Sequence, residues 1–427
     1  MQRYNKGFLF FICSVSAMGG LLFGYDWVVI GGAKPFYELY FGIADSPLMQ
    51  GVAMTTALIG CLVGAMVAGT AADKYGRKPL LMASAVLFTV SAIATGLFND
   101  LILFNVSRFI GGVGIGVASA LSPMYIAEVS PAEIRGRMVS LNQMTIVLGI
   151  LAAQIVNMLL ARDTSVADNM AWNVEWGWRW MFWAETLPAA LFLLMSFYIP
   201  ESPVFLNLKN EKKGKEAGLG ELFQHKYSKV IWLGLVIAVF QQWCGTNVIF
   251  NYAQEIFLGA GFDVDGMFIN IVITGIANVI FTFVALYTIE KWGRRTLILI
   301  GAGGLGLIYF ILGSCYFMQM TGVMMVALVV AAISVYAMTL GPVTWTLLAE
   351  IFPHRVRGIA MATCTFALWV GCCTLTFSFP SMNAVLGSSG TFWTYSAICV
   401  CAFIFLFRRC PETKGKSLEQ LEQELTA

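Results

Sequence analysis

Charged side chains are scarce in this sequence of 427 residues, and histidine occurs only twice. Asp, Glu, Lys and Arg make up 12% of the residues, hydrophobic residues make up 58%, and the mean hydropathy is +0.76. Soluble globular domains carry about 25% charged residues, so this scarcity excludes a water-soluble globule and indicates a membrane protein. The formal net charge of +2 offers no support for nucleic-acid binding, and no nucleic-acid partner is expected.

Motifs of enzymes and of ATP-driven pumps are also missing. The sequence has no GxxxxGKS or GxxxxGKT phosphate loop and no Ser, His and acid arrangement of a hydrolase. We therefore expect neither an ATP-driven pump nor an enzyme. Nine of the ten cysteines lie inside apolar segments, and neither histidine lies near a cysteine pair. This spacing fits neither a disulfide framework nor a metal site, so no metal or cofactor is expected.

Apolar runs long enough to cross a membrane occur twelve times. A helix needs about 20 apolar residues to cross a hydrocarbon core of about 30 Å. Because unpaired backbone groups are too costly in lipid, the spans are predicted to be helices. They lie near 7–32, 48–70, 79–98, 102–126, 138–160, 177–199, 229–252, 265–289, 296–317, 322–349, 357–380 and 390–409. GGVGIG at 111–116 imitates a dinucleotide fingerprint, but no strand precedes it, and small residues at a close helix–helix contact explain it better.

The same motifs occur twice, about half a chain length apart. DKYGRK at 73–78 returns as EKWGRR at 290–295, AEVSPAEIRG at 127–136 as AEIFPHRVRG at 349–358, and PESP at 200–203 as PETK at 411–414. Two similar halves are therefore joined in tandem, an architecture that lets two bundles rock around a central site. We predict an all-α membrane protein with a six-helix bundle at 1–200, a shortened cytoplasmic linker at 201–228, a second six-helix bundle at 229–411 and a cytoplasmic tail at 412–427.

Positive charge is distributed unevenly among the loops. All but four of the 26 Lys and Arg lie in the N-terminus, in the loops after even-numbered spans or in the tail. The four exceptions are Lys34, Arg108, Arg162 and Arg179. Cytoplasmic loops carry an excess of Lys and Arg, so both termini and the linker are predicted to be cytoplasmic.

The motifs together resemble the sugar porter family of the major facilitator superfamily. They are LLFGYD (21–26), GTAADKYGRK (69–78), SRFIGGVGIG (107–116), SPMYIAEVSPAEIRG (122–136), PESP (200–203), QQWCGTN (241–247), GPVTW (341–345) and PETKGKSLEQLE (411–422). The chain is most similar to bacterial proton-coupled D-xylose symporters and more distantly to facilitative glucose carriers. The resemblance implies two bundles of six helices, alternating access, and a monosaccharide held between the halves.

Amide and indole side chains inside apolar spans are the candidate sugar ligands. An amide carries two donors and an acceptor and so matches neighbouring sugar hydroxyls, whereas an indole ring matches the apolar C–H face. Gly245 interrupts span 7, and Gly341–Pro342 is expected to interrupt span 10, and such breaks mark transporter sites. The alternative is that the amides only join helices to one another. The resemblance implies a pocket lined by Phe23, Gln143, Gln241, Gln242, Asn247, Asn278, Trp345 and Trp369.

Two positions depart from the pattern of the xylose symporters. Leu368 stands where that pattern has a Gln before the Trp of span 11, and Asn251 stands where a Tyr usually follows the Asn of span 7. Both changes alter the polarity of the expected pocket. They leave the identity of the sugar open.

Asp26 is a carboxylate inside the first span. A charge at the bilayer centre costs about 3 kcal/mol, so the residue should be paired or functional. Arg108 is the expected partner. The pair can be a structural salt bridge or a proton switch, in which Arg108 holds Asp26 ionised until it moves away. Proton-coupled relatives carry an Asp and an Arg at these positions, which favours symport, and Glu185 in span 6 is the next candidate for the proton site.

The duplicated cytoplasmic motifs predict a latch of charged side chains. We expect these charges to join the bundles while the site faces outward and to separate when it opens inward. The alternative is a solvated basic rim, in which each ion pair contributes 0–1 kcal/mol. The latch residues are Asp73, Arg77, Glu128, Arg135 and Glu201 in the first half, and Glu290, Arg294, Glu350, Arg357 and Glu412 in the second.

The sequence thus predicts a monomeric monosaccharide–proton symporter of a bacterial cytoplasmic (inner) membrane. Its expected partners are the sugar, protons and membrane lipid. A facilitative uniporter of the same fold is the first alternative, with Asp26–Arg108 as a structural pair. A sugar sensor that does not transport is the second.

Overall fold

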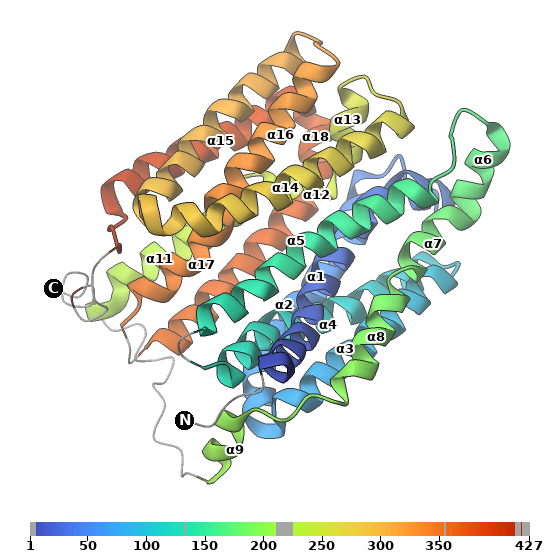
Figure 1. The fold of residues 1–427 in the computed structure, drawn as a ribbon. Coiled ribbons are helices and arrows are strands. Elements are labelled where there is room, and N and C mark those ends of the chain that lie inside the picture. The colour runs from blue at the N-terminus through green and yellow to red at the C-terminus, as the bar shows by residue number, and fades with distance from the viewer. Residues whose placement is uncertain (1–5, 132–133, 211–224, 354–355, 415–419, 421–427) are drawn as a thin grey trace. The chain divides into compact units, whose positions relative to one another are not determined.

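The structure, a computed structural model, describes residues 6–131, 134–210, 225–353, 356–414 and 420 (Figure 1). Within these residues all regular elements are helices. The chain divides into two compact units, Met1–Gly214 and Lys215–Ala427. The division falls within residues 201–228, where the linker is predicted, and the domain boundaries themselves stay a prediction.

Unit 1 begins with five long helices and continues in shorter ones. The long helices are α1 (Lys6–Tyr40), α2 (Pro47–Tyr75), α3 (Arg77–Leu97), α4 (Leu101–Val129) and α5 (Arg135–Leu160). The shorter elements are α6 (Ala167–Trp172), the π-helix η1 (Asn173–Gly177), α7 (Trp178–Trp183), α8 (Thr186–Ser196) and α9 (Pro203–Asn210). The sixth predicted span, 177–199, is therefore divided between α7 and α8, with Glu185 at the division.

Unit 2 also combines long helices with short ones, but its short helices lie at other places in the order. Its helices are α11 (His225–Trp243), α12 (Thr246–Asn251), α13 (Ala253–Gly259), α14 (Val264–Trp292), α15 (Arg294–Phe317), α16 (Val323–Met338), α17 (Leu340–Ile351) and α18 (Arg357–Arg409). The 53 residues of α18 are too many for one crossing. The backbone leaves the helical region at Gly387 (φ 67°, ψ 173°), which separates the two last predicted spans.

Ten helical segments of the described chain are long and apolar enough to cross a membrane. Two differences separate this count from the twelve predicted spans. The last segment, Ile359–Arg409, contains two spans, and the division of the sixth span leaves it below the required length. The all-helical membrane fold predicted from the sequence is confirmed.

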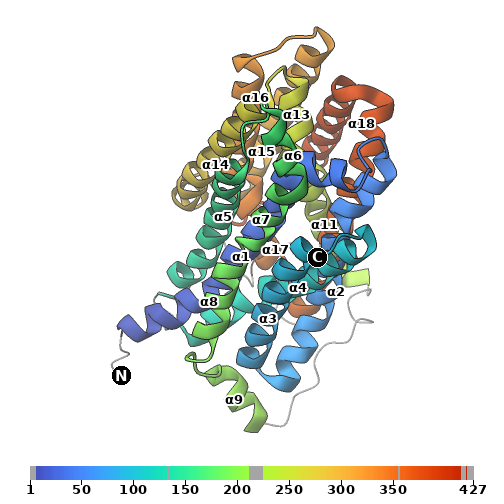
Figure 2. The ribbon, with the colours of Figure 1, turned by 90° about the vertical axis from the view of Figure 1, so that its right-hand side faces the viewer.

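Close packing of small residues joins α2 to α4, which lie side by side in both ribbon views (Figures 1 and 2). A Cβ added at Gly112 would lie 1.9 Å from the backbone oxygen of Ala57, and one added at Gly116 would lie 2.2 Å from that of Cys61. Since no side chain fits at such distances, these glycines let the two backbones approach. The interpretation of GGVGIG as a helix–helix contact is confirmed.

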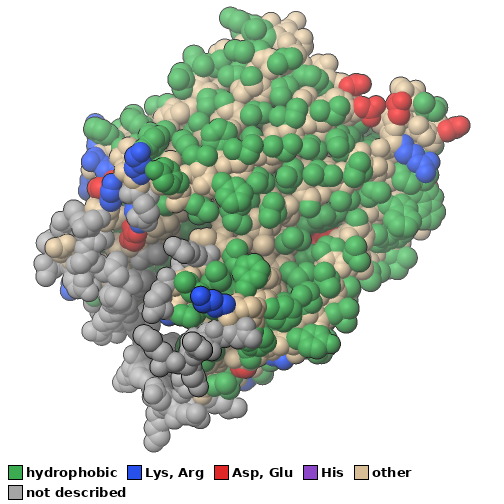
Figure 3. All heavy atoms as spheres, in the orientation of Figure 1, with side chains coloured by type: hydrophobic (Ala, Val, Ile, Leu, Met, Phe, Trp, Pro, Cys, Tyr) green, Lys and Arg blue, Asp and Glu red, His purple; other side chains and the backbone are tan. Residues whose placement is uncertain are grey.

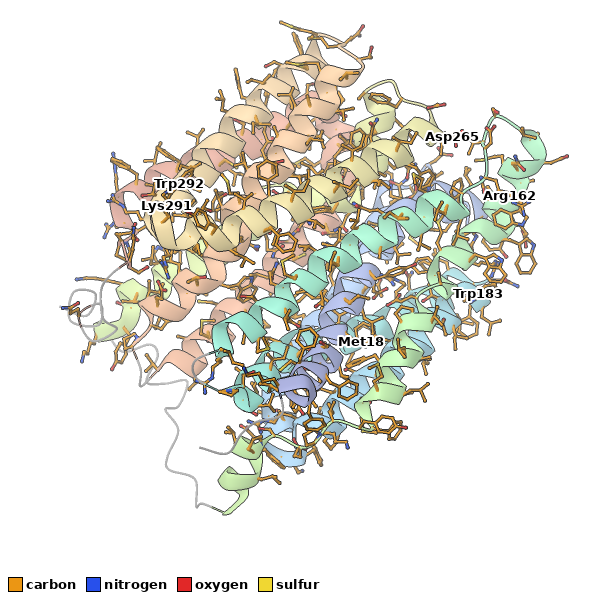
Figure 4. The ribbon with its side chains drawn as sticks, viewed as in Figure 1. Met18, Arg162, Trp183, Asp265, Lys291 and Trp292 are labelled. Carbon is orange, nitrogen blue, oxygen red and sulfur yellow. The ribbon has the colours of Figure 1, made fainter. Side chains whose placement is uncertain are left out.

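Polar side chains cap three of the helices, and charged side chains lie near helix ends. Ser46, Asp100 and Asp263 cap α2, α4 and α14 through their side chains. Apolar side chains cover most of the surface over α5 and α14, and charged side chains gather near the helix ends (Figure 3). Lys291 lies at one end of α14 and Asp265 at the other (Figure 4).

Candidate functional site

A chain of hydrogen-bonded polar side chains lies inside unit 2. Asn247 Nδ2 donates to Gln242 Oε1, Gln242 Nε2 donates to Gln241 Oε1 at 2.6 Å, and Gln241 Nε2 donates to the Tyr336 hydroxyl at 2.6 Å. The three amides are 5–8% exposed. The structure thus brings together three of the predicted sugar ligands, Gln241, Gln242 and Asn247, which we call the amide chain.

A helix break between α11 and α12 positions these amides. Gly245 has φ +85°, a left-handed conformation that side-chain-bearing residues adopt only at a cost. A Cβ at this position would lie 2.9 Å from the ring of Tyr395. Glycine is therefore required at the break for two reasons, backbone conformation and space. The break predicted in span 7 is confirmed.

The break in span 10 lies earlier than predicted. Helix α16 ends at Met338 and Thr339 leaves the helical region (φ −122°, ψ −86°), whereas Gly341 and Pro342 belong to the first turn of α17. The expectation that Gly341–Pro342 itself forms the break was wrong. Proline has no N–H to bond the carbonyl four residues earlier, which is that of Met338, so the helix ends there.

Tyr336 is a functional candidate that sequence reasoning missed. Its hydroxyl accepts a hydrogen bond from Gln241, which leaves its own proton to donate to another group. The residue lies in an apolar run of span 10, and nothing in that run distinguishes it from a packing aromatic. Only the packing of the elements places it beside the amides.

The remaining predicted pocket residues have different surroundings. In unit 2, Asn278 is buried and its side chain forms no hydrogen bond with a described residue, Trp369 is 4% exposed and Trp345 is 39% exposed. Leu368, which directly precedes Trp369, is also buried, at 3% exposure. In unit 1, Phe23 and Gln143 are half-buried on α1 and α5. The ring of Phe23 packs edge-on against Trp27 at 5.6 Å.

Unit 1 holds a buried ion pair between α1 and α4. Arg108 Nη1 bonds Asp26 Oδ1, and Arg108 Nη2 donates to the backbone oxygen of Asp26 at 3.2 Å. Both side chains are 2% exposed. The guanidinium carbon lies 5.2 Å from the centre of the Phe182 ring, a contact that favours a cation. The predicted partnership of Asp26 and Arg108 is therefore present.

A second carboxyl group joins this pair. The Glu185 side chain contacts that of Asp26 and lies near Arg108, and it is 2% exposed. Asp26 Oδ2 and Glu185 Oε1 have no hydrogen-bond donor when both groups are carboxylates. A proton on either group supplies that donor. Two carboxyl groups and one guanidinium are neutral together only when one carboxyl group is protonated.

Another buried ion pair lies further along α1. Lys34 Nζ is 3.0 Å from Glu38 Oε1, and both side chains are nearly inaccessible. Lys34 was an exception to the distribution of positive charge in the sequence. Its charge is compensated one helical turn away, within the same helix.

Charged side chains of unit 1 form one of the two predicted latch sets. Arg77 lies 3.0 Å from Glu128 and 3.4 Å from Asp73. Glu201 Oε1 accepts from the backbone N–H of Arg77 at 2.9 Å. Gly76 has φ +100°, and a Cβ there would lie 2.3 Å from Glu201 Oε2. Arg135 is exposed and forms no ion pair with a described residue.

Unit 2 repeats this arrangement around Arg294 among the residues that the structure describes. Arg294 lies 2.9 Å from Glu350, and Glu412 Oε1 accepts from the backbone N–H of Arg294 at 3.0 Å. Gly293 has φ +86°, and a Cβ there would lie 2.6 Å from Glu412. The side chains of Glu290 and Arg357 lie outside the described residues. The duplicated motifs thus build the same contacts within each unit, and a link between the bundles stays a prediction.

Comparison with known proteins identifies relatives over the whole chain. The family model "Sugar (and other) transporter" matches residues 12–223 and 208–425. The arabinose-proton symporter of Bacillus subtilis (strain 168) is 34% identical, covering 99% of this chain and 96% of that protein. The D-xylose-proton symporter of Escherichia coli (strain K12) is 34% identical, covering 98% and 96%. The inward-open structure of the xylose transporter XylE from E. coli superposes with a TM-score of 0.85 at 33% identity, covering 97% of this chain and 99% of that one.

Proposed function

Because the chain belongs to the sugar transporter family, we propose that it carries a monosaccharide across a membrane in symport with a proton. The observation that carries this proposal is the buried cluster of Asp26, Arg108 and Glu185 inside unit 1. The two relatives named above are sugar–proton symporters, which supports the same coupling here. The proposed substrate is a pentose or hexose similar to D-xylose or glucose.

Sugar recognition is assigned to the amide chain of unit 2. In the amide chain, the side-chain oxygens of Gln241 and Gln242 each accept one hydrogen bond, and each side chain donates one of its two N–H groups. Gln241 and Gln242 therefore each keep one N–H to donate to a sugar. The Tyr336 hydroxyl keeps its proton in the same way. The fixed donors match the oxygens of neighbouring sugar hydroxyls. Asn278, Trp345 and Trp369 of unit 2, and Phe23 and Gln143 of unit 1, are proposed as further sugar contacts.

Proton coupling is assigned to the cluster in unit 1. A buried net charge is costly, so the cluster is most stable with one proton shared between Asp26 and Glu185. In this proposal Arg108 stabilises the ionised carboxyl groups, and its movement during transport decides when the proton binds and leaves. Asp26 is the proposed carrier of the proton, and Glu185 and Arg108, buried beside it, set the pH at which the proton binds.

The orientation and the latch belong to the same proposal. The excess of Lys and Arg in the loops after even-numbered spans supports cytoplasmic termini in a bacterial inner membrane. The two charged sets, around Arg77 and around Arg294, then lie on the cytoplasmic side. We propose that they join the halves in the outward-facing state and that the protein acts as a monomer.

A facilitative uniporter is the second candidate function, and one measurement separates the two. Sugar added to energy-depleted cells should make the medium more alkaline if each sugar enters with a proton. Absence of alkalinisation, with sugar uptake intact, would identify a uniporter in which Asp26–Arg108 is structural. Proteoliposomes with a panel of pentoses and hexoses would then identify the sugar.

A further inference from the structure

A shallow apolar groove of about 490 Å³ runs along unit 2 between α11 and the second part of α18. Trp232, Val239 and Trp243 line it from α11, and Ile398, Cys401 and Phe405 line it from α18. Trp232 is 63% exposed. The lining side chains are hydrocarbon and aromatic except for the Cys401 thiol and the indole N–H groups of Trp232 and Trp243. No lining side chain is charged or carries a strong acceptor for a sugar hydroxyl, whereas a hydrocarbon chain fits.

The length of the groove matches one half of a bilayer. Trp232 and Trp243 are eleven residues apart on α11, which corresponds to about 16 Å at 1.5 Å per residue. The hydrocarbon core of a membrane is about 30 Å thick, so one leaflet provides about 15 Å. An acyl chain that starts at the Trp232 end therefore reaches the middle of the bilayer at the Trp243 end.

Positive charge lies at one end of the groove only. Lys229 precedes Trp232 by three residues and Arg408 follows Phe405 by three, so each lies on the same helix face as a lining residue. Both are exposed, and neither forms an ion pair within the described part of the chain. From residue 225 to 251 and from 387 to 409 no acidic side chain occurs. The indole N–H of Trp232, at the same end, has no acceptor among the described residues.

We propose that this groove binds an anionic phospholipid of the cytoplasmic leaflet. One acyl chain lies between α11 and α18, and the phosphate-bearing headgroup contacts Lys229 and Arg408. The leaflet follows from the orientation proposed above, but the binding itself does not depend on transport. Because Trp243 directly follows Gln242, the lipid lies against the helix that carries the amide chain.

Charge sets the expected preference for the headgroup. Each basic side chain near an anionic surface strengthens binding by roughly fivefold, so two should favour an anionic over a zwitterionic lipid by about 25-fold. The full-length protein, delipidated in detergent, is titrated with dioleoylphosphatidylglycerol or dioleoylphosphatidylcholine, and bound lipid is counted by native mass spectrometry. The Lys229→Gln/Arg408→Gln variant should bring the preference close to one.

Matched variants separate this site from general attraction to a basic surface. Lys6→Gln/Lys74→Gln also removes two exposed charges, from unit 1, and should keep the preference. Cys401→Phe fills the groove and should weaken binding of both lipids. An unchanged preference in Lys229→Gln/Arg408→Gln, or unchanged lipid binding in folded Cys401→Phe, overturns the proposal. A wild-type dimer that Cys401→Phe converts to a monomer would make the occupant a second copy of the chain and would also overturn it.

Discussion

Replacing Asp26 by Asn removes one carboxyl charge from the buried cluster of unit 1 but keeps its shape. The amide oxygen of Asn can accept from Arg108 Nη1, and the bond from Nη2 to the backbone oxygen at residue 26 is unaffected. The remaining charges, on Arg108 and Glu185, compensate each other. We therefore expect a folded protein, whereas Asp26→Ala removes the bond to Arg108 and should cost about 3–5 kcal/mol of stability.

Asp26→Asn is expected to abolish all of the free energy that proton entry supplies to sugar accumulation. A proton that enters down a membrane potential contributes about 2.3 kcal/mol per 100 mV, which corresponds to roughly a fiftyfold sugar gradient. A pH difference of one unit adds about another tenfold. In Asp26→Asn the site stays in a form that mimics the protonated group, so the steady-state ratio of sugar inside to outside should fall to one. Sugar binding and counterflow exchange should persist, because neither needs a net proton cycle.

The assay compares sugar-induced alkalinisation and accumulation of labelled sugar in the same cells. Glu185→Gln is the informative companion, since it removes the other carboxyl group of the cluster and leaves Asp26–Arg108 paired. We expect accumulation to survive in Glu185→Gln with an altered dependence on external pH. Alkalinisation of wild-type strength in Asp26→Asn would refute the assignment and move the proton to Glu185.

Three further substitutions test the sugar site and the charged sets. Tyr336→Phe should weaken sugar binding by about fivefold to tenfold, the contribution of one or two hydrogen bonds, while Tyr316→Phe should not; equal affinities in calorimetry would exclude the Tyr336 hydroxyl from the site. Leu368→Gln should change the ranking of xylose, glucose and their epimers in a competition panel, because a new polar partner favours a different hydroxyl; the same ranking would place residue 368 away from the sugar. Gly76→Ala should lower the free energy of unfolding in detergent by about 1–3 kcal/mol and by more than Gly42→Ala, which has a positive φ but open space around it; equal losses would show that the nearby carboxylate adapts.

Repeated local sequence is what made the charged sets predictable. The order Gly, Arg and later two Glu occurs in both halves, and the structure gives both halves the same contacts, from Arg77 to Glu128 and from Arg294 to Glu350. The partnership of Asp26 and Arg108 was predictable for a similar reason. A charge inside an apolar span needs compensation, and the half offered few cations.

Other features depend on information that the sequence pattern does not carry. Tyr336 matters because α16 places it beside Gln241, and a single aromatic in an apolar run gives no sign of that contact. The break at Thr339 was predicted two residues too late because proline acts on a carbonyl four residues before itself. The π-helix at Asn173–Gly177 leaves no signal in hydrophobicity, since its one extra residue per turn is a local change in hydrogen bonding.

The contact between Glu201 and the N–H of Arg77 also constrains how the protein is made. The two residues are separated by 124 positions, and ribosomes add about 5–20 residues each second. The start of α3 therefore waits about 6–25 s for the carboxylate that caps it, until the sixth span has left the ribosome. During this interval the charges around Arg77 lack one partner, so a chain that stops before residue 201 should be a preferred substrate for membrane quality-control proteases.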